Sequence, residues 1–154
     1  MPIWTPSLGA IPSAGAVAFC VWAPDHERVE LVVNDAAPRS LTRDADGYWS
    51  GRFTDVRVGD LYGYRLGSNE TVFPDPASRW QPHGIHGRSQ VVDPAAYRWS
   101  DHAWQPPAAD ALVFYELHVG TFSSAGSFAG IAAHLDHLAW LGVTHVELMP
   151  VAAF

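Results

Sequence analysis

The first 66 residues consist of short apolar runs separated by turn residues, with no helical period among them. A proline ends the first run at position 24, because proline cannot donate to the hydrogen-bond ladder of a strand. The pairs Asn34-Asp35 and Asp46-Gly47 are turn sequences, and the second pair favours a hairpin. About five short strands at this spacing predict an antiparallel, immunoglobulin-like β-sandwich. The expected strands lie within residues 16–24, 28–33, 40–44, 48–53 and 61–66.

Residues 111–154 follow a different pattern, in which a helix lies between two strands. The run 111–119 is apolar nearly throughout, as expected of a strand that is covered on both faces. Ser127 can cap a helix and Gly142 can end it, and residues 144–151 then return as a strand. This is the pattern of one parallel crossover. Four apolar residues at steps of three, four and three share one face of the expected helix: Phe128, Ile131, Leu135 and Leu138.

The stretch between these two parts, residues 73–110, is irregular. Its first fifteen residues contain three prolines and two glycines, yet they also include Trp80 and Ile85, which are unusual in a flexible linker. We expect an ordered interdomain strap anchored by Trp80. Two parallel strands with bare edges do not form a stable sheet alone, so the segment after the strap is expected to open a larger, truncated domain.

Composition narrows the possible functions. The 154 residues are 48% apolar and 16% charged, which is typical of a folded chain with room for one small domain and part of another. The net charge is -7 and no basic run is present, so neither nucleic acid nor an anionic membrane is an expected partner. The N-terminus lacks the pattern of a signal peptide, and no apolar run approaches about 20 residues, so we expect a cytoplasmic protein.

Several segments resemble the α-amylase superfamily. FCVWAPDHERVELVV, DGYW and YGYRL are similar to the N-terminal β-sandwich of its branching, debranching and trehalose-releasing members. VFYELHVGTF is similar to the first strand of their (β/α)8 catalytic barrel, and LGVTHVELMPV is similar to the second. The first helix of the barrel lies between these two strands. FPDPASRWQPHGIHGRSQVVDP and the final ELMPVAAF most resemble the malto-oligosyltrehalose trehalohydrolase family. The organisation that this implies is a sandwich at 1–72, the strap at 73–110 and a barrel opening at 111–154.

The resemblance implies the N-terminal part of a glycoside hydrolase that cleaves the α-1,4 bond next to a terminal trehalosyl unit of maltooligosyltrehalose and releases trehalose. Retaining cleavage needs two carboxyl groups about 5–5.5 Å apart. The resemblance places those groups after later barrel strands, so no catalytic residue is expected within these 154 residues. The chain alone is expected to be inactive and to need no cofactor. A branching or debranching enzyme, and a stand-alone glycan-binding sandwich, are the alternatives.

Three side chains are candidates for contact with the sugar substrate. His118 lies near the exit of the first strand of the expected barrel, and Phe154 follows the second strand, where it can stack on a sugar or pack its loop. In the sandwich, Trp49 follows a turn and is expected at the surface. Other sandwich aromatics lie within strand patterns and are expected in the core: Trp22, Tyr62 and Tyr64.

Two further sets of polar residues invite a chemical interpretation. Glu116 and Glu147 have similar contexts on neighbouring strands, but they lie in mid-strand, so we interpret them as wall carboxylates satisfied by arginine, histidine or backbone groups. His134 and His137 are three residues apart on the expected helix. Zinc needs three or four converging ligands, so we expect surface histidines and no metal site.

Overall fold

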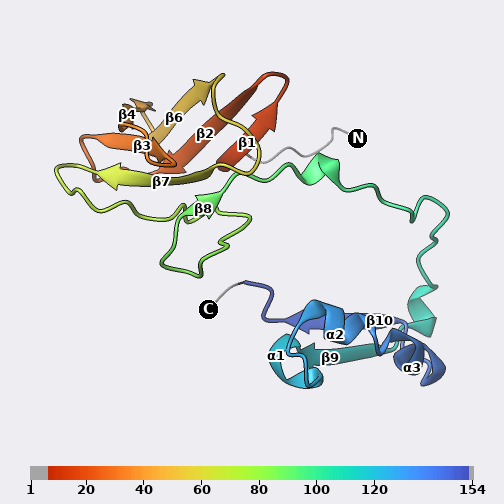
Figure 1. Cartoon of the computed structure of the whole chain (residues 1–154). Coiled ribbons are helices and arrows are strands. Elements are labelled where there is room, and N and C mark those ends of the chain that lie inside the picture. Colours follow the sequence, from red (N-terminus) through yellow and green to blue (C-terminus); the bar gives the residue numbers. More distant parts are fainter. Residues whose placement is uncertain (1–6, 153–154) are drawn as a thin grey trace. The chain divides into compact units, whose positions relative to one another are not determined.

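The computed structural model describes residues 7–152. The chain divides into two compact units, the first ending at Arg98 and the second beginning at Trp99. Figure 1 labels the strands β1 to β4 and β6 to β8 in the first unit, and β9, β10 and the helices α1 to α3 in the second.

Within the described residues, the first unit contains two four-stranded antiparallel sheets, whereas the sequence predicted an antiparallel sandwich of about five strands. One sheet has the order β1 (Gly9–Ser13), β2 (Ala16–Trp22), β6 (Tyr48–Phe53) and β5 (Thr42–Arg43). The other has the order β4 (Arg39–Ser40), β3 (Val29–Val33), β7 (Leu61–Leu66) and β8 (Ser89–Gln90). The Asp46-Gly47 hairpin is confirmed, because β5 pairs with β6 and Gly47 has a φ of +86°. Strand β1 was not predicted.

The two sheets pack face to face around one apolar core. Residue alternation along β2 sends Val17, Phe19 and Val21 inward, where they are buried. The ring of Phe19 meets that of Tyr62, on β7 of the other sheet, edge to face at 5.1 Å between centroids. Side chains of both sheets therefore share one core, which confirms the β-sandwich.

The burial of two tryptophans in this sandwich is the reverse of what the sequence predicted. Trp22 was expected in the core, but 57% of its surface is exposed, whereas Trp49 is only 6% exposed. The register of β2 with β6 explains the exchange, because Val21 pairs with Trp49 and Trp22 pairs with Tyr48. Val21 faces inward, so its partner does too, and the next pair faces outward. The buried Trp49 indole N–H donates to the Ala23 carbonyl at 3.0 Å.

Residues 73–98 belong to the first unit, and residues 99–110 belong to the second. The 73–98 part includes β8, which pairs with β7, and the short 3-10 helix Pro94–Ala96. Trp80 is 56% exposed within the described residues, and its expected role as the anchor of the strap stays a prediction. The buried residues of this segment are Asp75, Ser89 and Val91. Its role as a strap between domains stays a prediction.

The second unit contains one parallel strand pair and three short helices. Strand β9 (Phe114–His118) pairs with β10 (His145–Met149), so the predicted parallel strand-helix-strand crossover is confirmed. The helices are α1 (Val119–Phe122), α2 (Phe128–Ala132) and α3 (Leu135–Trp140), and a 3-10 turn, Ala109–Ala111, precedes β9. Both strands are shorter than predicted.

The single predicted helix is divided into α2 and α3. Ser127 caps it as predicted, since its hydroxyl accepts from the Gly130 N–H. The His134 ring lies 2.8 Å from the carbonyl of Gly130, and the His134 N–H bonds to Ile131 instead. A side chain that takes a ladder carbonyl interrupts a helix in this way. Of the four predicted core positions, Ile131 and Leu138 are buried, whereas Phe128 and Leu135 are exposed.

Among residues 7–152, no helix is long and apolar enough to cross a membrane.

Candidate functional site

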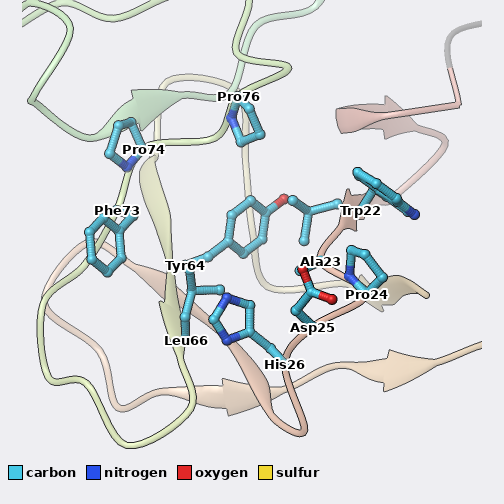
Figure 2. Close-up of a pocket in the computed structure, with 11 residues that line it drawn as sticks. Trp22, Ala23, Pro24, Asp25, His26, Tyr64, Leu66, Phe73, Pro74 and Pro76 are labelled. Carbon is cyan, nitrogen blue, oxygen red and sulfur yellow. The ribbon is translucent and has the colours of Figure 1, made fainter.

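A pocket opens at one end of the sandwich, where three segments far apart in sequence meet. The first segment is the end of β2 with the turn after it, residues 21–26, and the second is the end of β7, at Tyr64 and Leu66. The third is the start of the segment after β7, at Phe73, Pro74 and Pro76. The pocket encloses about 230 Å³. In Figure 2 the ring of Tyr64 lies between Phe73 and Pro74 on one side and Trp22 and Pro24 on the other.

Aromatic and proline rings form most of the pocket wall. Trp22 is 57% exposed and Phe73 is 37% exposed, so both rings present surface to solvent. The Trp22 indole N–H donates to the Asp46 carbonyl at 3.2 Å, which holds the ring in one orientation. Asp25 and His26 contribute the ionisable groups of the lining. A mostly apolar pocket with a few polar groups is the usual form of a small-ligand site.

Backbone pairing holds the Phe73 side of the pocket in place. Tyr64 and Phe73 form an antiparallel bridge, with N–H to carbonyl distances of 2.8 Å in both directions. The bridge passes over Gly63, where an added Cβ would lie 2.5 Å from the Phe73 carbonyl oxygen. Only glycine therefore allows the two backbones to come this close.

A buried polar cluster lies beneath the pocket, centred on Asp75. Its carboxylate accepts from the hydroxyls of Tyr62 at 2.8 Å and Tyr64 at 3.4 Å, and from the Ala77 N–H at 2.8 Å. The Asp75 N–H donates to the buried Ser89 hydroxyl at 3.0 Å. Asp75 is only 2% exposed. The cluster joins residues 75–89 to the core of the sandwich.

Burial governs ionisation in this cluster. It raises the pKa of the Asp75 carboxyl above its ordinary value, although the hydrogen bonds from Ala77 and the two tyrosines act in the opposite direction. Burial and the nearby Asp75 carboxylate raise the pKa of Tyr62 and Tyr64 well above the usual range. Both tyrosines therefore keep their protons at neutral pH and act as donors.

In the second unit, His118 is the last residue of β9 and is exposed at the carboxyl end of the strand. Its Nδ1 accepts from the Gly120 N–H at 3.1 Å. The neutral imidazole must then carry its proton on Nε2, which can donate to a ligand hydroxyl. The Gly120 contact also fixes the ring at the start of α1.

Glu116 and Glu147 are register partners on the parallel strands β9 and β10. Both are exposed, and within residues 7–152 neither carboxylate has a hydrogen bond or an ion pair. The arginine, histidine or backbone partners that the sequence analysis expected are thus missing from the described residues. Their mid-strand position is as expected, since each is the third residue of a five-residue strand.

Of the three predicted sugar-contact residues, the structure describes two, Trp49 in the first unit and His118 in the second. The expectation that Trp49 lies at the surface is wrong, because it is buried in the core and its ring cannot reach a ligand. His118 lies in the second unit, and Phe154 lies outside the described residues. Sequence reasoning missed the pocket around Trp22, although strict alternation from Phe19 would have placed Trp22 outward. Within residues 7–152, no group of three histidine, cysteine or acidic side chains could hold a metal ion.

Two antiparallel sheets packed face to face, with an aromatic pocket at one end, define a β-sandwich binding module. Residues 7–96 match the family profile of Carbohydrate-binding module 48 (Isoamylase N-terminal domain), which is more than half of the chain. The chain belongs to this family.

Curated relatives extend the similarity through the second unit. The chain is 44% identical over 138 residues to a malto-oligosyltrehalose trehalohydrolase of Saccharolobus solfataricus, with 90% of this chain and 24% of that protein covered. It is 45% identical over 141 residues to the enzyme of that name from Mycobacterium tuberculosis, with 88% of this chain and 24% of that protein covered. A 1,4-alpha-glucan branching enzyme of Salinibacter ruber is 34% identical over 168 residues, with 94% and 27% covered. The chain thus resembles the trehalohydrolases and spans about a quarter of their length.

Solved structures of similar proteins agree. A candidate alpha amylase from Salmonella typhimurium superposes with a TM-score of 0.90 at 38% identity, covering 98% of this chain and 26% of that one. The apo pullulanase of Paenibacillus barengoltzii has a TM-score of 0.75 at 26% identity, and the match covers 96% of this chain and 27% of the pullulanase chain. The chain is therefore related to glycoside hydrolases of the α-amylase family and has the sandwich that such enzymes carry.

Proposed function

We propose that this chain is the N-terminal part of a glycoside hydrolase that cleaves the α-1,4 bond next to a terminal trehalosyl unit of maltooligosyltrehalose and releases trehalose. The observation that carries the proposal is the identity of 34–45% to trehalohydrolases across both units, with several of them at 44–45%, whereas a branching enzyme is 34% identical. A stand-alone sugar-binding sandwich has no need of the parallel β9–β10 crossover, which argues against that alternative.

In this proposal β9 and β10 are the first two strands of a (β/α)8 barrel. Active sites of such barrels lie at the carboxyl ends of the strands. His118 occupies that end of β9, with an Nε2–H available for a sugar hydroxyl. We assign His118 and Phe154 to the wall of the sugar cleft. The nucleophile and the acid/base carboxyl come from later strands of the barrel, outside these 154 residues.

The proposal is tested by expressing the complete open reading frame that contains this chain and incubating the product with maltooligosyltrehalose. We expect free trehalose and a malto-oligosaccharide as products. Formation of α-1,6 branches on amylose, or cleavage of α-1,6 links alone, would overturn the trehalohydrolase assignment in favour of the branching or debranching relatives. His118→Ala should raise KM or lower kcat in that enzyme, whereas His137→Ala, on α3, serves as the matched control.

A further inference from the structure

We propose that residues 75–79 form a clasp that ties strand β1 to strand β7, so that β1 and residues 75–91 open together as one unit while β2 and β6 stay paired. The inference concerns the first unit alone and does not depend on the proposed function. Pro74 and Pro76, which line the pocket, stand on either side of Asp75, so opening of the clasp also releases that part of the pocket wall.

Strand β1 has little to hold it within its own sheet. It is five residues long and contains Gly9 and Pro12, and both residue types weaken a strand. Within the described residues it lies at the edge of its sheet and pairs only with β2. A short edge strand of this composition needs contacts from outside the sheet to stay in place.

One arginine of the clasp supplies such contacts at the start of β1. The guanidinium of Arg79 donates to the Ala10 carbonyl at 2.9 Å and to the Leu8 carbonyl at 3.3 Å. A guanidinium presents several N–H donors in one fixed plane, so a single side chain can bond both carbonyls. Arg79 is half-buried, and a hydrogen bond from a charged donor is stronger there than at the open surface.

The clasp and β1 also meet backbone to backbone, at Gly9. A Cβ added to Gly9 would lie 2.9 Å from the Ala77 carbonyl oxygen and 3.1 Å from Nη1 of Arg79. Gly9 also has a φ of +87°, which residues with a side chain rarely adopt. The two segments are therefore in close contact, and lifting the clasp exposes the start of β1.

The other end of the clasp is held by the second sheet. The buried Asp75 carboxylate accepts from the hydroxyls of Tyr62 and Tyr64, which both belong to β7. The Asp75 N–H donates at 3.0 Å to the hydroxyl of Ser89, the first residue of β8. The clasp thus bonds to β1 in one sheet and to β7 and β8 in the other.

A short turn joins the two ends of the clasp. The Ala77 N–H donates to the Asp75 carboxylate at 2.8 Å, and the Ser78 N–H donates to the Asp75 carbonyl at 3.0 Å. Because these bonds fix the turn, a displacement at Arg79 is transmitted to Asp75. Native proteins open locally in cooperative units of this kind, at a lower free energy than global unfolding requires.

The test is hydrogen exchange of the 154-residue chain, followed by NMR and compared between wild type and Arg79→Ala. We expect the protection of the β1 amides to fall together with that of the Ala77 and Gln90 amides, by about tenfold or more, which corresponds to about 1.4 kcal/mol. The amides that pair β2 with β6 should change by less than about twofold. Arg79→Lys should lose part of the protection, because an ammonium lacks the planar fork of donors.

Arg43→Ala is the matched control. Arg43 lies in β5, at the opposite edge of the same sheet, and it also donates to a backbone carbonyl at 2.9 Å, that of Pro24. Its loss should leave exchange in β1 and in residues 75–91 within about twofold of wild type.

Three results would overturn the inference. If Arg79→Ala lowers protection in β1 while the Ala77 and Gln90 amides keep theirs, the clasp does not couple the two segments. If it changes neither, Arg79 does not hold β1 in place. An equal loss in β2 and β6 also contradicts the inference, because the whole sandwich then opens rather than one unit of it.

Discussion

Replacing Asp75 by alanine should destabilise the sandwich more than any exposed carboxylate does. The change deletes the acceptor of two buried hydroxyls, those of Tyr62 and Tyr64, and of the Ala77 N–H. A buried donor left without a partner costs about 1–3 kcal/mol. Removing Asp75 also removes the cost of burying its carboxylate, which the raised pKa reflects. We therefore expect a net loss of about 2–4 kcal/mol in the free energy of unfolding.

The assay is urea unfolding of the whole chain, monitored by NMR amide signals of β2 and β7 so that only the first unit is reported. With a slope of about 2 kcal/mol per molar urea, in the middle of the usual range, the midpoint should fall by about 1–2 M. The control is Asp55→Ala, since the Asp55 carboxylate accepts two hydrogen bonds from Arg39 but is exposed to solvent, and its midpoint should hardly change. An Asp75→Ala midpoint equal to that of Asp55→Ala, at unchanged slope, would refute the reasoning.

Three further outcomes follow from the same structure. Burial raises the pKa of Asp75 above its ordinary 3.8, so the folded chain keeps the proton of this carboxyl to a higher pH than the unfolded chain does. The urea midpoint of wild type, relative to that of Asp75→Asn, should therefore fall as the pH rises from about 4 through the folded pKa. Parallel plots of midpoint against pH for the two proteins would contradict this. Gly63→Ala should push Phe73 away and lower the free energy of unfolding by about 1–3 kcal/mol, which a lower urea midpoint would show. Unchanged amide shifts of Phe73 would count against it. Hydrogen exchange should be faster in β9 and β10, which within residues 7–152 pair only with each other, than in β2, which is paired on both sides. Equal protection would point to an unidentified partner.

Local rules account for much of the backbone. The Asp46-Gly47 hairpin, the Ser127 cap and the parallel crossover of β9 and β10 all agree with the sequence prediction, because turn chemistry, capping and apolar periodicity act within a few residues. The resemblance to trehalohydrolases rests on the same kind of contiguous motif. No local rule, however, places the ring of His134 beside the Gly130 carbonyl, where it divides the predicted helix.

Local sequence rules do not predict the pocket at the end of the sandwich. Its wall combines residues 21–26 with Tyr64, Leu66, Phe73, Pro74 and Pro76. The sequence contains no sign that these segments meet.

The sequence by itself determined most of the strands, though not β1, together with the Asp46-Gly47 turn and the Ser127 cap, since those choices depend on neighbouring residues. Only the tertiary structure decided which face of each strand is buried. Tyr48 and Trp49 are adjacent and both aromatic, so the sequence does not tell which of the two side chains is buried. Trp49 pairs with Val21, which faces inward, so Trp49 lies in the core and Trp22 lies outside. Asp75 shows the same dependence, because a carboxylate between two prolines resembles a surface turn until two tyrosines from β7 satisfy it inside the sandwich.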